Sequence, residues 1–99
     1  MPDKGIKILS PKASDVFKTG DFYEILWKAE PAELEFGAMV TVEFSKDGGK
    51  SWEKVEENVP NNGKYLWKVP KADSTQCQVR VFSQRRSIYR GTSEMFAVK

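Results

Sequence analysis

Histidine is absent from this sequence, and cysteine occurs once, as Cys77. The missing histidine excludes Ser–His and Cys–His nucleophilic catalysis, because both chemistries use an imidazole as the general base. One thiol can neither form a disulfide within the chain nor complete the ligand set of a structural zinc ion. We therefore expect a protein that is not an enzyme and holds no cofactor or metal. Cys77 is interpreted as a small buried hydrophobe, with a reactive thiol or a crosslink to another chain as the alternatives.

The sequence also lacks an excess of one charge and any long apolar run. Its 16 basic and 14 acidic residues leave a formal net charge of +2 at pH 7. Nucleic-acid binding usually requires a concentrated basic surface, which this balance does not suggest. No apolar run approaches the roughly 20 residues of a transmembrane helix, and the first ten residues contain no apolar core of a signal peptide. We expect neither a nucleic-acid partner nor a transmembrane segment.

Carboxylates are plentiful, but their spacing favours neither catalysis nor calcium binding. Glu53, Glu56 and Glu57 fall in one charged segment. Glycosidases need two carboxyl groups about 5 to 10 Å apart across a cleft, so a solvated strand face is the better interpretation here. A calcium loop would show a run of alternating aspartates. The aspartates occur singly instead, at Asp3, Asp15, Asp21, Asp47 and Asp73.

What the sequence does contain is a series of short segments in which apolar and polar residues alternate. Two of them flank Asp47-Gly48-Gly49, a combination that tolerates positive φ and predicts a β-hairpin over Val40–Val55. Residues 30–37 favour either one helical turn or an acidic loop. The whole chain, residues 1–99, is predicted to be one domain. Seven strands are predicted, at residues 5–9, 22–29, 38–44, 52–57, 64–69, 76–83 and 92–98.

Strands of this length, separated by turn signals every eight to twelve residues, predict an all-β, seven-stranded antiparallel β-sandwich. Trp27 and Trp67 alternate in step with other apolar residues, so we expect both rings in the core. Trp52 stands at the end of the hairpin, and its position stays open between core and surface. Phe22 and Leu26 lie on the polar side of their strand, so we expect that face to be half covered.

Residues 45–52, Ser-Lys-Asp-Gly-Gly-Lys-Ser-Trp, match the Ser-x-Asp-x-Gly-x-x-Trp pattern. This segment resembles the Asp-box of sialidase-like propellers. The resemblance implies that Asp47 hydrogen-bonds to backbone groups of the loop and that Trp52 packs beneath it. A propeller needs several blades, so a single copy indicates a shared turn geometry and not a propeller.

A wider set of landmarks spans nearly the whole chain. They are Ser10-Pro11, Gly20 before Tyr23–Trp27, Val42–Gly49 with Trp52, Asn62–Pro70, Cys77–Val81, and Thr92-Ser93 with Phe96. In this order they resemble the immunoglobulin-like or fibronectin-III-like modules of microbial cell-surface and secreted proteins, in particular the N-terminal domain of Ser-Thr-rich, GPI-anchored wall proteins. That family has an acidic segment where this chain has Arg90-Gly91-Thr92-Ser93. The resemblance implies an extracellular or cell-surface, monomeric and non-catalytic module.

The function expected on these grounds is a non-catalytic interaction or spacer module, which presents its loops and an outer sheet face to a protein or polysaccharide partner. The alternative is a carbohydrate-binding module that uses exposed aromatic rings. Basic residues gather toward the C-terminal half, with Lys68 among them, and could contact an acidic polymer or partner. The candidate ligand-binding residues are Trp52, Tyr89, Arg80, Arg85, Arg86 and Arg90.

Overall fold

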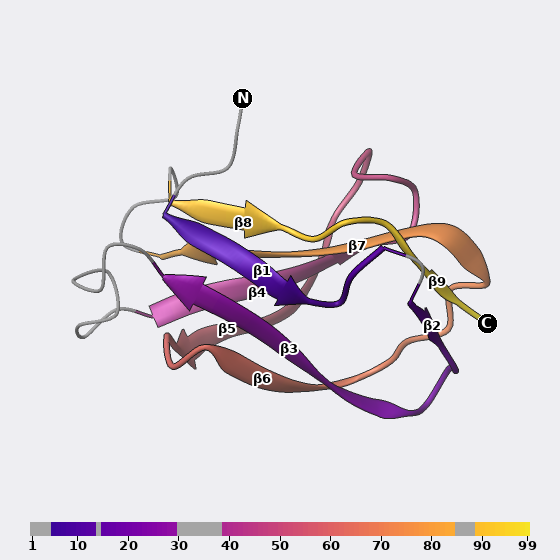
Figure 1. Ribbon diagram of the computed structural model, residues 1–99, viewed down its shortest axis with the longest axis horizontal. Coiled ribbons are helices and arrows are strands. Elements are labelled where there is room, and N and C mark those ends of the chain that lie inside the picture. The colour runs from indigo at the N-terminus through magenta and orange to yellow at the C-terminus, as the bar shows by residue number, and fades with distance from the viewer. Residues whose placement is uncertain (1–4, 14, 30–38, 85–88) are drawn as a thin grey trace.

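The computed structural model describes residues 5–13, 15–29, 39–84 and 89–99. Segment 30–37, predicted to be a helical turn or an acidic loop, lies outside these residues, as do Arg85 and Arg86. The described chain is all-β and folds into two packed sheets, in agreement with the predicted β-sandwich (Figure 1).

Nine strands lie in the described residues, where the sequence predicts seven. Val16 and Phe17 form a short strand of their own, and the predicted strand 92–98 is divided by a break after Thr92. The strands are β1 (Ile6–Ser10), β2 (Val16–Phe17), β3 (Phe22–Ala29), β4 (Met39–Ser45), β5 (Glu53–Pro60), β6 (Lys64–Lys68), β7 (Ser74–Ser83), β8 (Arg90–Thr92) and β9 (Phe96–Val98).

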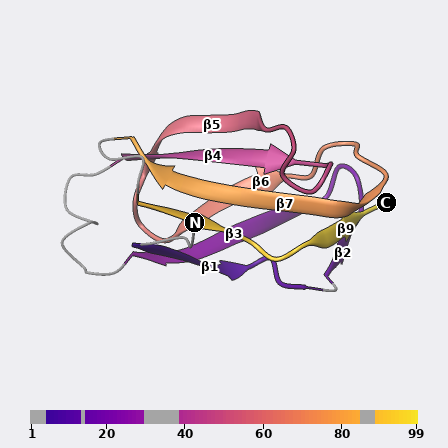
Figure 2. The same ribbon diagram turned by 90° about the horizontal axis from the view of Figure 1, so that it is seen from above.

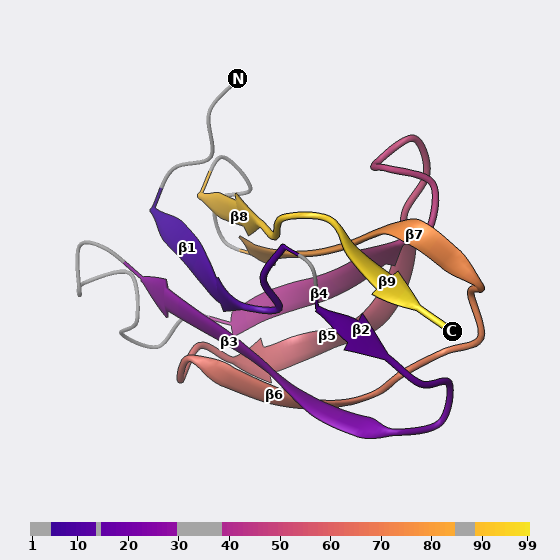
Figure 3. The ribbon, with the colours of Figure 1, turned by 45° about the vertical axis from the view of Figure 1, so that its right-hand side comes forward.

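The two sheets differ in size and share no strand. The smaller one has the order β1-β3-β6, and the larger one has the order β2-β9-β7-β4-β5 with β8 also paired to β7. Figure 2 shows these two layers from above. The sequence predicts an antiparallel sandwich throughout, and the β2–β9 pair departs from this because it is parallel. After β1 the chain crosses to the larger sheet and enters it beside the C-terminal strand, running in the same direction (Figure 3).

The core lies between the sheets and is centred on aromatic rings. Trp27 and Trp67 are 3% and 2% exposed, which confirms the prediction that both belong to the core. The Trp67 ring centroid lies 5.4 Å from that of Phe44 and 6.2 Å from that of Phe96, so it joins both sheets. The indole Nε1 of Trp27 donates a 2.7 Å hydrogen bond to Asn61 Oδ1, which satisfies its buried polar group. Other buried apolar residues are Ile6, Ile25, Val40, Val42, Val59, Val69, Cys77, Val79, Val81 and Val98.

Along one edge the two sheets approach each other closely, where β1 lies beside β8 (Figure 1). A parallel bridge joins Gly5 to Arg90. A Cβ atom on Gly91 would lie 2.4 Å from the carbonyl oxygen of Ile6, which no real side chain tolerates. Glycine at this position therefore permits the approach of the two strands.

Candidate functional site

The turn between β4 and β5 is held together by hydroxyl and carboxylate side chains. Ser45 Oγ donates to Asp47 Oδ1 at 2.7 Å and accepts from the Gly49 backbone N–H at 2.9 Å. Asp47 accepts in addition from the Ser51 backbone N–H at 2.9 Å and from the Ser51 hydroxyl at 2.5 Å. Gly48 and Gly49 have φ values of 73° and 90°, as the predicted turn chemistry requires. The expected role of Asp47 in bonding the loop backbone is confirmed.

These hydrogen bonds also decide what the Asp47 carboxylate can do. The donors from Ser51 and Ser45 hold the pKa of the Asp47 carboxyl well below its usual range. The carboxylate is thus ionised and already occupied by donors from its own turn. The turn is in addition tied to β7, since Gly48 N donates to Gln76 O at 2.8 Å. We assign this motif a structural role.

Two of the predicted site residues, Trp52 and Arg80, meet on the outer face of the larger sheet. Arg80 Cζ lies 4.2 Å from the centroid of the Trp52 ring and 5.9 Å from that of Phe82, within cation–π range of both. Glu43 is directly opposite Arg80 in the β4–β7 register. Its Oε1 accepts from both Nε and Nη2 of the guanidinium, at 2.6 Å each. Arg80 is therefore already paired with an anion and an aromatic face.

The position that the sequence left open for Trp52 is thus intermediate between core and surface. The indole is half-buried, and the Arg80 guanidinium covers one of its faces. Its Cζ2 lies 3.5 Å from where a Cβ on Gly49 would stand, so the turn closes off part of the ring edge. Sugar stacking needs a broad, open aromatic face, and this arrangement leaves little of one on Trp52.

The other predicted site residues lie at β8 or outside the described residues. Arg90 is in β8, directly opposite Phe82 in the β7–β8 register, and is half-buried. Tyr89 precedes it, and its carbonyl oxygen accepts a 3.0 Å hydrogen bond from Ser83 N. The positions of Arg85 and Arg86 fall outside the described residues.

The outer face of β3 and β6 is a surface that sequence reasoning only partly anticipated. Phe22 is 65% exposed and Leu66 is 60% exposed, so the described residues leave open a face that the sequence suggested would be half covered. In the β3–β6 register, each apolar residue of this face stands opposite a charged one. This surface, the lysine–apolar face, consists of Phe22, Glu24, Leu26, Lys28, Lys64, Leu66 and Lys68.

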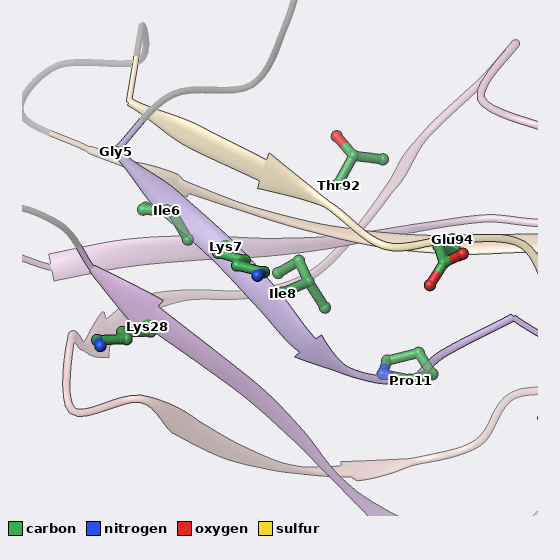
Figure 4. A pocket seen from close by; sticks show the side chains of 8 residues that line it. All are labelled: Gly5, Ile6, Lys7, Ile8, Pro11, Lys28, Thr92 and Glu94. Carbon is green, nitrogen blue, oxygen red and sulfur yellow. The ribbon is translucent and has the colours of Figure 1, made fainter.

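A groove of about 550 Å³ runs along β1, between the small sheet and the segment that connects β8 to β9. Ile6, Ile8 and Pro11 supply its apolar lining. Figure 4 shows Glu94 on the β8 side of β1, Lys28 on the β3 side at the opposite end of the groove, and Lys7 on β1 between them. Its charged groups therefore have opposite signs and do not converge on one point, which a catalytic or ion-binding site would require.

A second groove, of about 300 Å³, lies between β5 and β6. Both strands are outermost in their sheets. The many charged residues of β5 suit an edge strand, because they discourage pairing with other chains. Burial, together with the nearby Glu56 carboxylate, raises the pKa of the Tyr65 phenol. The apolar lining of this groove comes from Phe44, Val55, Tyr65 and Trp67.

The described residues contain neither a cluster of metal ligands nor an exposed thiol. No group of three or more His, Cys, Asp or Glu side chains among the described residues could hold a metal ion. Cys77 is fully buried in β7, as predicted, and burial raises the pKa of its thiol. A buried thiol with a raised pKa is a poor nucleophile, so Cys77 serves packing.

The exposed apolar residues of the lysine–apolar face left a signal in the sequence. Phe22 and Leu26 break the polar alternation of their strand, and Leu66 lies between two lysines of β6. Exposed apolar side chains in such positions often mark interaction surfaces. The pairing of Arg80 with Glu43 left no such signal, because their spacing in the sequence says nothing of a register between β4 and β7.

Within the part of the chain that the structure describes, no helix has the length and apolar character that a membrane crossing requires. Comparison of the chain with protein-family models, with curated proteins and with solved structures finds no match.

Proposed function

We propose that this chain is a non-catalytic interaction module of immunoglobulin or fibronectin-III type, part of a cell-surface or secreted protein, which binds an acidic partner protein through an outer sheet face. The observation that carries the proposal is the lysine–apolar face. Phe22 and Leu66 expose more than half of their surface there, and the face as a whole carries three lysines against one glutamate, Glu24. An apolar patch with charge of mainly one sign favours a partner with apolar and acidic side chains.

The strand order supports the immunoglobulin or fibronectin-III type of fold. In that class, strands A, B and E share one sheet, and C, F and G share the other, to which C′ can be added. Assigning β1, β3 and β6 to A, B and E leaves β4, β5 and β7 as C, C′ and F, with β8 and β9 as a divided G. The two-residue β2, which follows β1 and pairs with β9, is then a continuation of A in the larger sheet. Cys77 then lies in strand F and has no second cysteine with which to form the inter-sheet disulfide of antibody domains.

Carbohydrate binding through Trp52 is the less favoured function. The guanidinium that covers one indole face is itself held by Glu43. A sugar could stack only on the remaining face, or after the Arg80–Glu43 pair had broken. The lysine–apolar face requires no such rearrangement.

A nuclear magnetic resonance titration tests the proposal. The backbone amides of β3 and β6 and the three tryptophan indole N–H signals are followed while polyglutamate, polygalacturonate, or oligosaccharides of chitin, β-glucan and mannan are added. We expect polyglutamate to shift the β3 and β6 amides, with the shifts decreasing at higher salt because the contacts are between exposed charges. A saturable shift of the Trp52 indole with a neutral oligosaccharide would support the carbohydrate-binding alternative and contradict the proposal, as would a preference for polygalacturonate.

A matched pair of variants locates the contact. Phe22→Ser removes the most exposed apolar ring of the lysine–apolar face, whereas Val16→Ser removes a 55% exposed apolar side chain from β2, outside that face. Phe22→Ser should weaken binding, and Val16→Ser should leave it unchanged. Equal effects of the two substitutions would mean that binding does not use this face.

A further inference from the structure

Strand β6 carries backbone groups that no described strand pairs with. It is outermost in its sheet and pairs on one side with β3. Val69 N donates to Asp21 O, and Val69 O accepts from Gly20 N, both at 2.8 Å, so the backbone of Val69 faces the β3 side. Gly63 O likewise accepts from Trp27 N at 3.0 Å. Both groups of one residue point the same way in an antiparallel ladder, and the direction alternates along the strand.

The alternation assigns a direction to each residue of β6. Tyr65 and Trp67 direct their N–H and C=O groups toward β3, whereas Lys64, Leu66 and Lys68 direct theirs away from it. Among the described residues, Lys64 N finds a partner in the Asn62 side chain. The N–H groups of Leu66 and Lys68 have no hydrogen-bond partner in the same part of the chain, and they point out of the sheet edge.

The space beside this edge fits a strand. The groove between β5 and β6 lies next to it, with the half-buried side chains of Val55 and Tyr65 in its lining. An added strand would turn alternate side chains toward this groove and the others toward the lysine–apolar face. We expect groove-facing residues to be apolar, because Phe44, Val55, Tyr65 and Trp67 line the groove and its charged groups, Glu53, Lys54 and Lys68, have opposite signs.

The β6 side chains on the lysine–apolar face select the residues that an added strand would place on that same face. Directly opposed side chains on paired strands interact, and opposite charges stabilise the pair. Lys64 and Lys68 flank Leu66, so the complementary order is acidic, apolar, acidic at every second position. The matching segment therefore reads Glu-Val-Leu-Val-Glu, with the valines facing the groove.

We propose that the exposed edge of β6 binds an extended, acidic and apolar segment of a partner protein by β-strand addition. The inference rests on the proposed function and specifies how the acidic partner is bound. Backbone hydrogen bonds from Leu66 and Lys68 supply the pairing, and the flanking lysines select the charge of the segment. A second copy of β6 would not serve, because antiparallel pairing about Leu66 would place Lys64 of each copy opposite Lys68 of the other, and like charges destabilise such pairs.

Amide hydrogen exchange of the intact chain gives the first test. In the free protein, the Leu66 and Lys68 amides should exchange faster than the Tyr65 and Trp67 amides, which bond to β3. The capped peptide Ser-Glu-Val-Leu-Val-Glu-Ser should slow exchange at Leu66 at least about tenfold, because opening must then break the added ladder. The control peptide Ser-Lys-Val-Leu-Val-Lys-Ser should have no such effect.

Two variants at one position separate backbone pairing from side-chain contact. Leu66→Ala shortens the side chain and keeps the backbone N–H, whereas Leu66→Pro also removes the N–H. Proline is tolerated at an edge-strand position whose N–H would point out of the sheet. We expect the acidic peptide to bind Leu66→Pro about tenfold more weakly than Leu66→Ala, since a carbonyl of the peptide is left unpaired. If circular dichroism shows that Leu66→Pro does not fold, the wild-type test stands in its place: the acidic peptide must slow amide exchange at Leu66, and unchanged exchange there would overturn the proposal.

Two double substitutions separate edge binding from binding to the face in general. Lys64→Gln with Lys68→Gln should abolish the preference for the acidic peptide, whereas Lys7→Gln with Lys28→Gln, a cross-strand pair of β1 and β3, should keep it. Binding that shifts the β3 amides without protecting Leu66 would overturn strand addition and leave the proposed function standing. If the acidic peptide does not bind at millimolar concentration, strand addition is also overturned. The proposed function is judged separately, by whether polyglutamate shifts the β3 and β6 amides.

Discussion

At the scale of single residues, Gly91 allows two strands to approach and Asp47 holds a turn together. Gly91 faces the Ile6 carbonyl so closely that a methyl group would lie 2.4 Å from the oxygen. Asp47 holds the β4–β5 turn through several hydrogen bonds from its own loop. Each of these two residues supports a separate prediction.

Gly91→Ala should destabilise the protein by about 1–3 kcal/mol, because β1 and β8 must move apart to accept the added methyl group. Urea unfolding followed by tryptophan fluorescence measures the change. Gly20→Ala is the control: Gly20 has a φ of 91° and no atom within 4 Å of its added Cβ, so only local backbone strain is introduced. Gly91→Ala should shift the amide signals of Gly5 and Ile6, and Gly20→Ala should not. Unchanged stability and unchanged Ile6 signals in Gly91→Ala would contradict the observed approach of the strands.

Asp47→Asn should reduce stability in a pH-dependent way. Because the folded pKa of Asp47 is lowered, its ionised form stabilises the fold at pH values above its ordinary pKa of 3.8, and this contribution is lost as the pH falls from there toward the folded pKa. The difference in unfolding free energy between the wild type and Asp47→Asn should therefore be largest above about pH 5 and shrink below about pH 4. Urea unfolding of both proteins from pH 7 to pH 2.5 measures it. A difference that stays constant over this range would show that the ionised form of Asp47 does not matter.

At the scale of elements, the last strand of the sandwich is interrupted between β8 and β9, and one side chain provides a hydrogen bond at the break. Between β8 and β9, Ser93 Oγ accepts a 3.0 Å hydrogen bond from Val79 N and donates one of 2.9 Å to Glu94 O. The hydroxyl takes the place of a backbone carbonyl in the ladder with β7. The Val79 N–H of β7 is therefore bonded across the break between β8 and β9.

Ser93→Ala should cost about 1–3 kcal/mol, because it leaves the buried N–H of Val79 without an acceptor. Thermal and urea unfolding measure the loss. Thr75→Ala, which changes an exposed hydroxyl on the same strand β7, should change stability by no more than about 0.5 kcal/mol. If both variants were equally stable, a water or another group would have to satisfy Val79.

At the scale of the whole molecule, the described strands leave two open edges on one side of the sandwich, at β5 and β6. The β5 edge is crowded with charges, including the Lys54–Glu57 ion pair at 3.2 Å. The β6 edge is protected by the two lysines that flank Leu66. Charged residues on edge strands discourage pairing between copies of a chain, and we expect the protein to stay monomeric.

Lys64→Thr with Lys68→Thr should convert the protein into one that self-associates. The double substitution removes the like charges that oppose each other when two β6 edges pair, and threonine favours the strand conformation. Sedimentation velocity over a range of protein concentrations measures the association. Lys7→Thr with Lys12→Thr makes the same change of net charge away from β6 and should leave the protein monomeric. Self-association of the wild type, or of the control alone, would contradict the role given to the β6 lysines.

Much of the fold was predictable because it depends on local patterns. The alternation around Trp27 and Trp67 indicated which way each ring points, and both are in the core. The Asp47-Gly48-Gly49 segment indicated the hairpin, since positive φ is a local property of these residues. The break after Thr92 was not predicted, because the Ser93 hydroxyl replaces a ladder carbonyl only when β7 lies beside it.

The candidate site was less predictable than the fold. Trp52 and Arg80 were identified as candidates, but their mutual contact and the pairing of Arg80 with Glu43 depend on how β4, β5 and β7 align. That alignment is a relation between distant segments, and no local pattern encodes it. Phe22, at the edge of a predicted strand, could be recognised as exposed only once no described element was found to cover it.

The amino-acid sequence by itself determined the all-β class, the central hairpin, which alternate residues of each strand face the core, and the absence of histidine chemistry. Each of these depends on composition or on side chains a few residues apart. The tertiary structure decided which strands are outermost, which faces stay open and which charges are paired. These properties arise from contacts between segments far apart in the chain, as between β1 and β8 or β2 and β9. The open edge of β6 belongs to this second group, since a strand has an unpaired edge only when the rest of the fold has placed no neighbour beside it.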